Sequence, residues 1–292
     1  MRPLLARFLR SGAGRVGIGV LVLVGLFVGL VPALSSADPD AIDFTLRNQG
    51  PSGAHPLGTD YFGRDLLVRL ALGGRLSLEI SLLALGIVLV VGFCYGAVAG
   101  MLPRRLDDAA MRLVDAALAI PRFPTMVIIL VIAGLRTNVG TLVLALAVGG
   151  WMIPARLVRL ELVTLRQRHF VTAARAVGVG PVRLVVRHFL PNALGALLIA
   201  AFLELPALVL MEAFASALGL GINPPTPTWG NIAYDGLDYR DTWEVFIASA
   251  AIAVFAIAAN FAADGLQEAL EPRRDAVVPR RFLRRLVARV SR

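Results

Sequence analysis

Long apolar stretches separated by short polar segments dominate the sequence. A helix needs roughly 20 apolar residues to cross a hydrocarbon core of about 30 Å, at about 1.5 Å per residue. Six stretches approach or exceed that length, at residues 16–34, 76–102, 116–135, 139–155, 193–218 and 245–263. The pattern predicts an all-α polytopic membrane protein with six transmembrane helices.

Polar and helix-breaking residues interrupt the third stretch. Pro121, Arg122 and Pro124 fall inside it, so it crosses the membrane only if its helix begins before the prolines and tolerates a kink. The first stretch resembles a secretory signal, with arginines before it and the small residues of SSA after it. Its length exceeds that of a usual signal core, which favours a retained span.

The composition agrees with a membrane location. Of the 292 residues, 57% are hydrophobic and the mean hydropathy is +0.74, more than a soluble core needs. All 29 basic residues are arginine, and basic residues concentrate in the cytoplasmic segments of membrane proteins. An N-in, C-in orientation leaves only a minority outside, namely Arg47, Arg64, Arg69, Arg75, Arg136 and Arg240, with Arg122 unassigned. We therefore expect a multi-pass protein of the plasma membrane with both termini in the cytoplasm.

The net charge of +9 follows mainly from this orientation, and membrane lipid with anionic headgroups is the expected partner. A nucleic-acid partner is not expected, because the arginines are spread over several loops instead of forming one basic patch with aromatic residues. Cys94 is the only cysteine, which excludes an intrachain disulfide and a cysteine metal cluster. His55, His169 and His188 do not have the spacing of metal ligands, so no metal site is expected.

Four regions follow from this pattern. Residues 1–35 form a cytoplasmic stretch and the first transmembrane helix, and residues 36–75 form an external loop that leads into an interfacial helix. Residues 76–272 form a five-helix core, whose loop at 156–192 is cytoplasmic. Residues 273–292 are predicted to form a basic amphipathic helix on the membrane surface, with a disordered tail as the alternative.

Two connecting segments carry further expectations. Residues 103–115 are predicted to form a charged helix at the membrane surface. Residues 219–243, which lie outside, show no helical period and many turn signals, and they predict an ordered loop stiffened by proline.

Glycines at every fourth position mark the second apolar stretch. Gly92, Gly96 and Gly100 give a helix one smooth face on which another helix can pack closely. We expect this stripe to form a helix–helix interface.

The segment HFVTAARAVGVGPVRLVVRHFLPN, residues 169–192, is basic and lies between two apolar stretches. Gly178 and Gly180 are suited to end a first short helix, and Pro181 is suited to the first turn of a second one. Pro191 biases Leu190 away from helical geometry and is expected to end that second helix at Phe189. The small side chains of Ala173 and Ala174 allow another surface to approach. From the residues alone, docking of a partner and anchoring on anionic lipid through the arginines are equally compatible with this segment.

The pattern TAARAVG followed by FLPN resembles the cytoplasmic "EAA" loop of permease subunits in binding-protein-dependent ABC importers. HPLGTDYFGRDLLVRL, MRLVDAALAIP, LGLGINPPTPTWGNIAYDG and NFAADGLQEALEPRR resemble stretches of the second, C-type permease of dipeptide, oligopeptide and nickel importers. Five motifs in the family's order, over most of residues 38–273, make the resemblance specific. One departure concerns Thr172, which stands where the family has a glutamate.

The resemblance implies a type I ABC importer permease that forms half of a pathway for peptides. Its partners would be a homologous second permease, two cytoplasmic ABC ATPase subunits and an external solute-binding protein. The chain lacks a G-x-x-x-x-G-K-[ST] phosphate loop, so it is not expected to be an enzyme or to hold a cofactor, and ATP and Mg would be bound by the ATPases. The ATPase-coupling residues would be Thr172, Ala173, Ala174, Arg175, Gly178, Gly180, Pro181, Leu190 and Pro191. The pathway or gate candidates would be Glu212, Pro224, Pro225 and Trp229.

Other transport functions stay open at this point. Nickel or another small solute could be the cargo within the same family, and peptide length is not specified by the sequence. A self-sufficient secondary transporter would need ionisable residues within the membrane, for which Glu204 and Glu212 are candidates. An intramembrane enzyme is disfavoured, because no catalytic set of residues converges on one membrane level.

Overall fold

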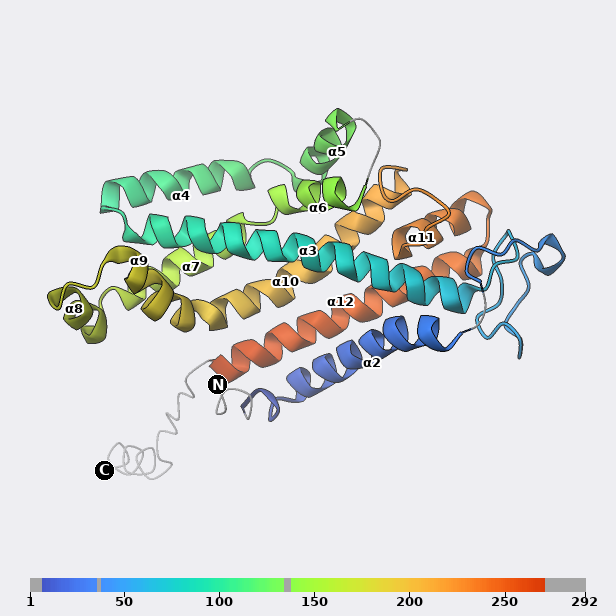
Figure 1. The fold of residues 1–292 in the computed structure, drawn as a ribbon, viewed down its shortest axis with the longest axis horizontal. Coiled ribbons are helices and arrows are strands. Elements are labelled where there is room, and N and C mark those ends of the chain that lie inside the picture. Colours follow the sequence, from blue (N-terminus) through green and yellow to red (C-terminus); the bar gives the residue numbers. More distant parts are fainter. Residues whose placement is uncertain (1–6, 36–37, 134–137, 271–292) are drawn as a thin grey trace, which may run out of the picture.

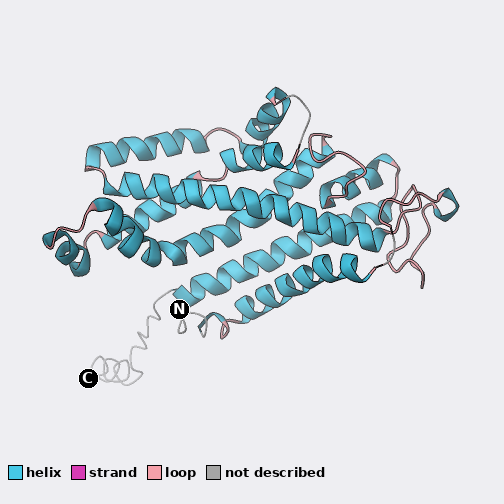
Figure 2. Cartoon of the chain, in the orientation of Figure 1, coloured by secondary structure: helices cyan, strands magenta, loops and turns pink. Residues whose placement is uncertain are grey.

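The computed structural model describes residues 7–35, 38–133 and 138–270. These residues form helices joined by loops, with one isolated β-bridge between Thr59 and Asp65 (Figure 2). The main elements are α2 (Gly12–Leu34), α3 (Leu66–Met101), α4 (Arg104–Leu118), α5 (Arg122–Ile132), α6 (Val139–Val148), α7 (Met152–Leu165), α8 (His169–Ala176), α9 (Pro181–Leu184), η2 (Val185–Phe189), α10 (Leu190–Ala217), α11 (Trp229–Asp238) and α12 (Thr242–Leu270). A short helix, η1 (Phe44–Leu46), lies in the loop before α3.

Four of these segments are long and apolar enough to cross a membrane as single helices: α2, α3, the run from α9 to α10, and α12. The predicted third and fourth spans are each a pair of helices instead of one. The α4–α5 pair bends by 79° and the α6–α7 pair by 51°, and counting each pair as one span gives up to six spans.

The two breaks have local causes in the sequence. Pro121 caps the N-terminus of α5 in an extended conformation, which separates α5 from the last turn of α4. Between α6 and α7, Gly149 and Gly150 follow one another, and glycine lowers helix stability by roughly 1 kcal/mol relative to alanine. The helix predicted at 103–115 is present as α4, which begins at Arg104 after Pro103 and lies along α3 and α7. Asp107 bonds Arg159 of α7 at 2.6 Å, and Asp115 pairs with Arg156.

Two loop predictions are corrected by the helix boundaries. The residues expected to form a separate interfacial helix are the first turns of α3, which begins at Leu66 behind an Asp65 cap and has 36 residues. At about 1.5 Å per residue, α3 is roughly 54 Å long and exceeds the hydrocarbon core. The predicted loop 219–243 contains α11, whose N-terminus is capped by the Thr228 hydroxyl.

The helices form an elongated bundle (Figure 1). The start of α2 and the end of α12 lie at the same end of the bundle as α8, while residues 38–65 and α11 lie at the opposite end. This arrangement agrees with both termini on one side of the membrane. The basic tail predicted at 273–292 lies outside the described residues.

The glycine stripe of α3 lies against α7. A Cβ at Gly92 would come within 2.6 Å of the Pro154 side chain, and one at Gly96 would overlap the carbonyl of Ala155. At Gly100 the neighbour is the Leu162 side chain, at 3.1 Å. The three glycines therefore let α3 and α7 approach closely along their length.

Candidate functional site

Residues 169–192 form two short helices at one end of the bundle, joined by a tight turn. Gly178 has φ +79°, a left-handed conformation that suits glycine. The N–H of Val179 bonds the carbonyl of Ala174 at 3.0 Å, and that of Val177 bonds Ala173 at 3.2 Å. These bonds close α8 at the glycine, as the sequence predicted. Gly180 then caps α9, and Pro181 occupies its first turn.

One side of this two-helix segment is fixed to the bundle. Val171 and Phe189 are fully buried, and they join a core cluster with Leu162 and Leu165 of α7 and Ala97 of α3. Ala174, expected to face a partner, belongs to this internal cluster instead.

The other side is exposed and largely apolar. Val177 is 81% exposed and Val182 is 75% exposed, and Thr172, Ala173, Gly178, Gly180 and Pro191 are exposed as well. Large apolar side chains left open at the end of a bundle mark a place for protein contact.

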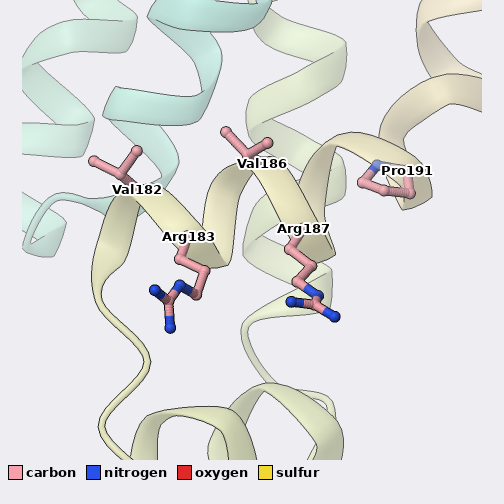
Figure 3. Close-up of a pocket in the computed structure, with 5 residues that line it drawn as sticks. All are labelled: Val182, Arg183, Val186, Arg187 and Pro191. Carbon is pink, nitrogen blue, oxygen red and sulfur yellow. The ribbon is translucent and has the colours of Figure 1, made fainter.

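The exposed face of the second helix is shown in Figure 3. Val182 and Val186 project from one side of the helix, and the Arg183 and Arg187 side chains extend from another. Together with Pro191 they line an open hollow. The arginines and the valines therefore offer charged and apolar contacts side by side.

The second helix does not end before Pro191, which corrects the sequence prediction. Leu190 has φ −55° and ψ −49° and is helical, and Pro191 lies in the first turn of α10. Between α9 and α10 the chain winds as a π-helix, η2, closed by a bond from the N–H of Leu190 to the carbonyl of Val185. The wider turn carries the helix across the proline, so α9, η2 and α10 are continuous.

A buried hydrogen-bond network lies near the opposite end of the bundle, around Glu212. The carboxylate accepts a bond from Ser77 of α3 at 2.8 Å and another from Ser216 at 2.9 Å. Ser77 also accepts the N–H of Trp229 at 3.1 Å, and the Ser216 hydroxyl lies 3.3 Å from that of Thr228. Glu212 thus connects α10 to α3 and to the N-terminus of α11.

Of the other gate candidates, one is buried and two lie on the surface. Trp229 is 1% exposed and donates its indole N–H to the carbonyl of Leu70 at 3.0 Å. Pro224 and Pro225 are exposed on the loop before α11. Of these candidates, Glu212 and Trp229 are therefore buried and hold the loop, whereas Pro224 and Pro225 are exposed on it.

Buried charges tie residues 38–65 to α3 and α11. Arg64 bonds Asp60 at 2.6 Å and approaches Asp235 of α11 at 3.5 Å. Arg69 is 2% exposed and donates to the carbonyl of Pro39 at 3.1 Å. Burial raises the pKa of Asp235, against the opposing effect of Arg64. These charges fix residues 38–65 to the body of the protein.

Sequence reasoning missed Ser77, Ser216, Thr228 and Asn231 in the Glu212 network. Thr228 could have been found, because a threonine directly before a helical segment is a good N-terminal cap. Ser77 could not, because its partners are far away in the sequence. Within the described residues, no group of three or more His, Cys, Asp or Glu side chains could hold a metal ion.

Comparisons with known proteins agree with this geometry. Two structures of the MetNI methionine ABC transporter in inward-facing conformations match with TM-scores of 0.54 and 0.57, at 24% and 22% identity. The matches cover 70% and 69% of this chain and 97% and 96% of theirs. The chain therefore has the permease fold of type I ABC importers.

Two relatives from Bacillus subtilis (strain 168) match over most of their length. The oligopeptide transport system permease protein OppC is 32% identical over 269 residues, covering 91% of this chain and 88% of the relative. The dipeptide transport system permease protein DppC is 35% identical over 260 residues, covering 87% and 81%.

Residues 92–276 match the family described as the binding-protein-dependent transport system inner membrane component. The match includes the two-helix segment, the glycine stripe and most of the Glu212 network. Permeases of this family are multi-pass, non-catalytic membrane subunits that act with ATPases and binding proteins. The chain belongs to the family of binding-protein-dependent transport system inner membrane components, the permeases of ABC importers.

Proposed function

We propose that this chain forms one half of the translocation pathway of a peptide importer, beside a homologous second permease. Two cytoplasmic ATPases bind ATP and Mg, and an external binding protein delivers di- or oligopeptides. The relatives named for oligopeptide and dipeptide transport support peptides as the cargo. Membrane lipid surrounds the pair, and nucleic acid has no role.

The observation that carries the proposal is the two-helix segment 169–192. It exposes an apolar and basic face while its other side is anchored on α3 and α7. An ATPase bound to that face can push on α7 through the buried contacts and on α10 through the continuous helix from Pro181. Energy from ATP then enters the membrane helices through contact with the ATPases, which bind the nucleotide.

The family's glutamate is replaced by Thr172, which is exposed on α8. A threonine cannot pair with a basic group of an ATPase. Docking of this chain therefore depends on the backbone turn at Gly178 and on the apolar contacts of Val177 and Val182.

A pair of glycine substitutions tests the docking. A methyl group added at Gly178 or at Gly180 would meet no other atom within 4 Å, but only Gly178 has a positive φ. Gly178→Ala costs about 1 kcal/mol in a left-handed conformation, so ATPase co-purification and uptake should fall roughly fivefold. Gly180→Ala has the same added bulk without the strain and should behave like the wild type.

A double variant, Arg183→Gln with Arg187→Gln, tests the alternative that the segment anchors on lipid. If it abolishes uptake while Gly178→Ala transports normally, the segment is a membrane anchor and the docking account is wrong.

The cargo is tested separately with the reconstituted importer and its binding protein. ATP hydrolysis should rise with di-, tri- or longer peptides. Stimulation by a nickel chelate or another small solute alone would overturn the proposed cargo while leaving the coupling intact.

A further inference from the structure

Arg122 of α5 and Glu204 of α10 form an ion pair that belongs neither to the two-helix segment 169–192 nor to the Glu212 network. Nη2 of Arg122 lies 2.8 Å from Oε2 of Glu204. Glu204 lies midway along α10, which spans Leu190–Ala217. Charged groups at the middle of a transmembrane helix are costly and usually serve a function.

The pair lies where the broken spans meet. Arg122 is the first residue of α5, directly after the break from α4. Its side chain also reaches the break between α6 and α7, since a Cβ at Gly149 or Gly150 would lie 3.3 or 3.2 Å from it. Discontinuous helices form the substrate sites of many secondary transporters, where their free ends contact charged groups of the substrate.

The dipole of α5, the helix that Arg122 begins, does not explain the position of Arg122. A cation at the N-terminus of a helix is disfavoured by the helix dipole, and α5 begins with this arginine. The guanidinium is held instead by Glu204 and lies beside the C-terminal end of α6, which favours a cation. The contacts of the guanidinium therefore explain the position of Arg122, and the helix that it begins does not.

The guanidinium has donor capacity to spare. An arginine carries five N–H donors, and the one ion pair uses Nη2, while Nε is buried without a partner. The Arg122 side chain is 25% exposed, whereas that of Glu204 is 4% exposed. A ligand can thus reach the arginine more easily than the glutamate, and a planar carboxylate suits a guanidinium.

We propose that Arg122 binds the C-terminal carboxylate of a peptide within the translocation pathway, with Glu204 as the positioning residue that holds the guanidinium in place. This inference rests on the proposed peptide import. Every linear peptide carries such a carboxylate, so the site accepts peptides of different sequence. Helix α7 begins at the same break and leads to α8. A ligand at Arg122 therefore lies near the start of the helix that connects this site to the two-helix segment 169–192.

The test compares trialanine with trialanine amide, which lacks the carboxylate. Binding is measured by calorimetry on the complete permease–ATPase complex in nanodiscs, without the binding protein. Wild type should bind trialanine about tenfold more tightly than the amide, a difference of about 1.4 kcal/mol. Arg122→Gln should remove this preference, and Arg122→Lys should retain part of it.

Two further variants guard against a merely structural effect. Arg122→Gln with Glu204→Gln removes both charges, so it avoids an unpaired buried acid and keeps the complex folded. It should also bind both peptides equally. Arg159→Gln with Asp107→Asn removes a similar ion pair, at 2.6 Å with side chains 27% and 8% exposed, on another part of the bundle, and should keep the preference.

Several outcomes would overturn the inference. These are no peptide binding or no preference in the wild type, an unchanged preference in Arg122→Gln, or loss of the preference in the Arg159 control as well. If the importer with its binding protein still hydrolyses ATP in response to peptides, only the inference at Arg122 fails. If no peptide stimulates it, the proposed function fails.

Discussion

At the scale of single residues, Glu212 shows how a buried acid can hold the loop before α11 without facing solvent. Its side chain is fully buried, and both of its oxygens accept serine hydroxyls. Each serine also contacts the start of α11, through the N–H of Trp229 or the hydroxyl of Thr228. The acid therefore fixes the loop through intermediaries.

Glu212→Gln should preserve most of this network. The amide oxygen can accept from Ser77, and the amide nitrogen can donate to Ser216, whose hydroxyl can turn toward Thr228. We expect a loss of stability below about 1 kcal/mol, whereas Glu212→Ala leaves the buried Ser77 hydroxyl without its acceptor, removes the link between Ser77 and Ser216, and should cost about 2 kcal/mol or more. Thermal unfolding of the purified complex measures both, with uptake falling only in the alanine variant. Equal stability of the two variants would show that the network contributes nothing.

At the scale of elements, the close contact between α3 and α7 depends on small residues. Gly96 lies against the backbone of Ala155 and the Val158 side chain, while Gly86 on the same helix has open space around its Cα. The two positions differ in contact and share their helical conformation.

Gly96→Ala should separate α3 from α7, because the backbone of Ala155 cannot move as a flexible side chain could. We expect a destabilisation of about 1–3 kcal/mol, as for other overpacked interiors. Gly86→Ala should be neutral or stabilising by up to about 1 kcal/mol, because alanine favours helices. Unfolding in detergent compares the pair. An unchanged melting temperature for Gly96→Ala would mean that the two helices have room to adjust.

Among the features of the helices, the sequence predicted the breaks within the spans least well. Hydrophobic length located α2, α10 and α12 closely, because a span needs many apolar residues in a row. It could not reveal the 51° bend between α6 and α7, since glycine is frequent in straight membrane helices too. The π-turn before Pro191 was also missed, because local propensity treats a proline as a helix end, whereas a wider turn can accommodate it.

At the scale of the whole molecule, the orientation in the membrane is open to a direct test. Val177 and Ile42 lie at opposite ends of the bundle and are 81% and 58% exposed. In a Cys94→Ser background, a membrane-impermeant maleimide added to intact spheroplasts should label Ile42→Cys. It should label Val177→Cys only after the membrane is opened. Leu23→Cys, in the middle of α2 and 65% exposed, serves as a lipid-facing control that stays unlabelled. Labelling of Val177→Cys in intact cells would reverse the predicted topology.

The sequence predicted the parts of the candidate sites that depend on neighbouring residues. It missed the parts that depend on contacts between residues far apart in the sequence. The turn at Gly178 follows from neighbouring residues, so the sequence located it. The pairing of Arg122 with Glu204 joins residues 82 positions apart, and the orientation of Ala174 toward the bundle depends on how α8 packs. Such long-range contacts are set by tertiary packing and leave no local signal.

The π-turn at Val185–Phe189 also determines the direction in which the docking face points. A π-turn holds one residue more than an α-turn, so everything before it is rotated by roughly 100° about the helix axis relative to α10. Losing a single residue here would leave the sequence of the face intact but point Val182 and Arg183 in a different direction from the bundle. The number of residues in this turn therefore affects how a partner fits as much as the side chains that the partner touches.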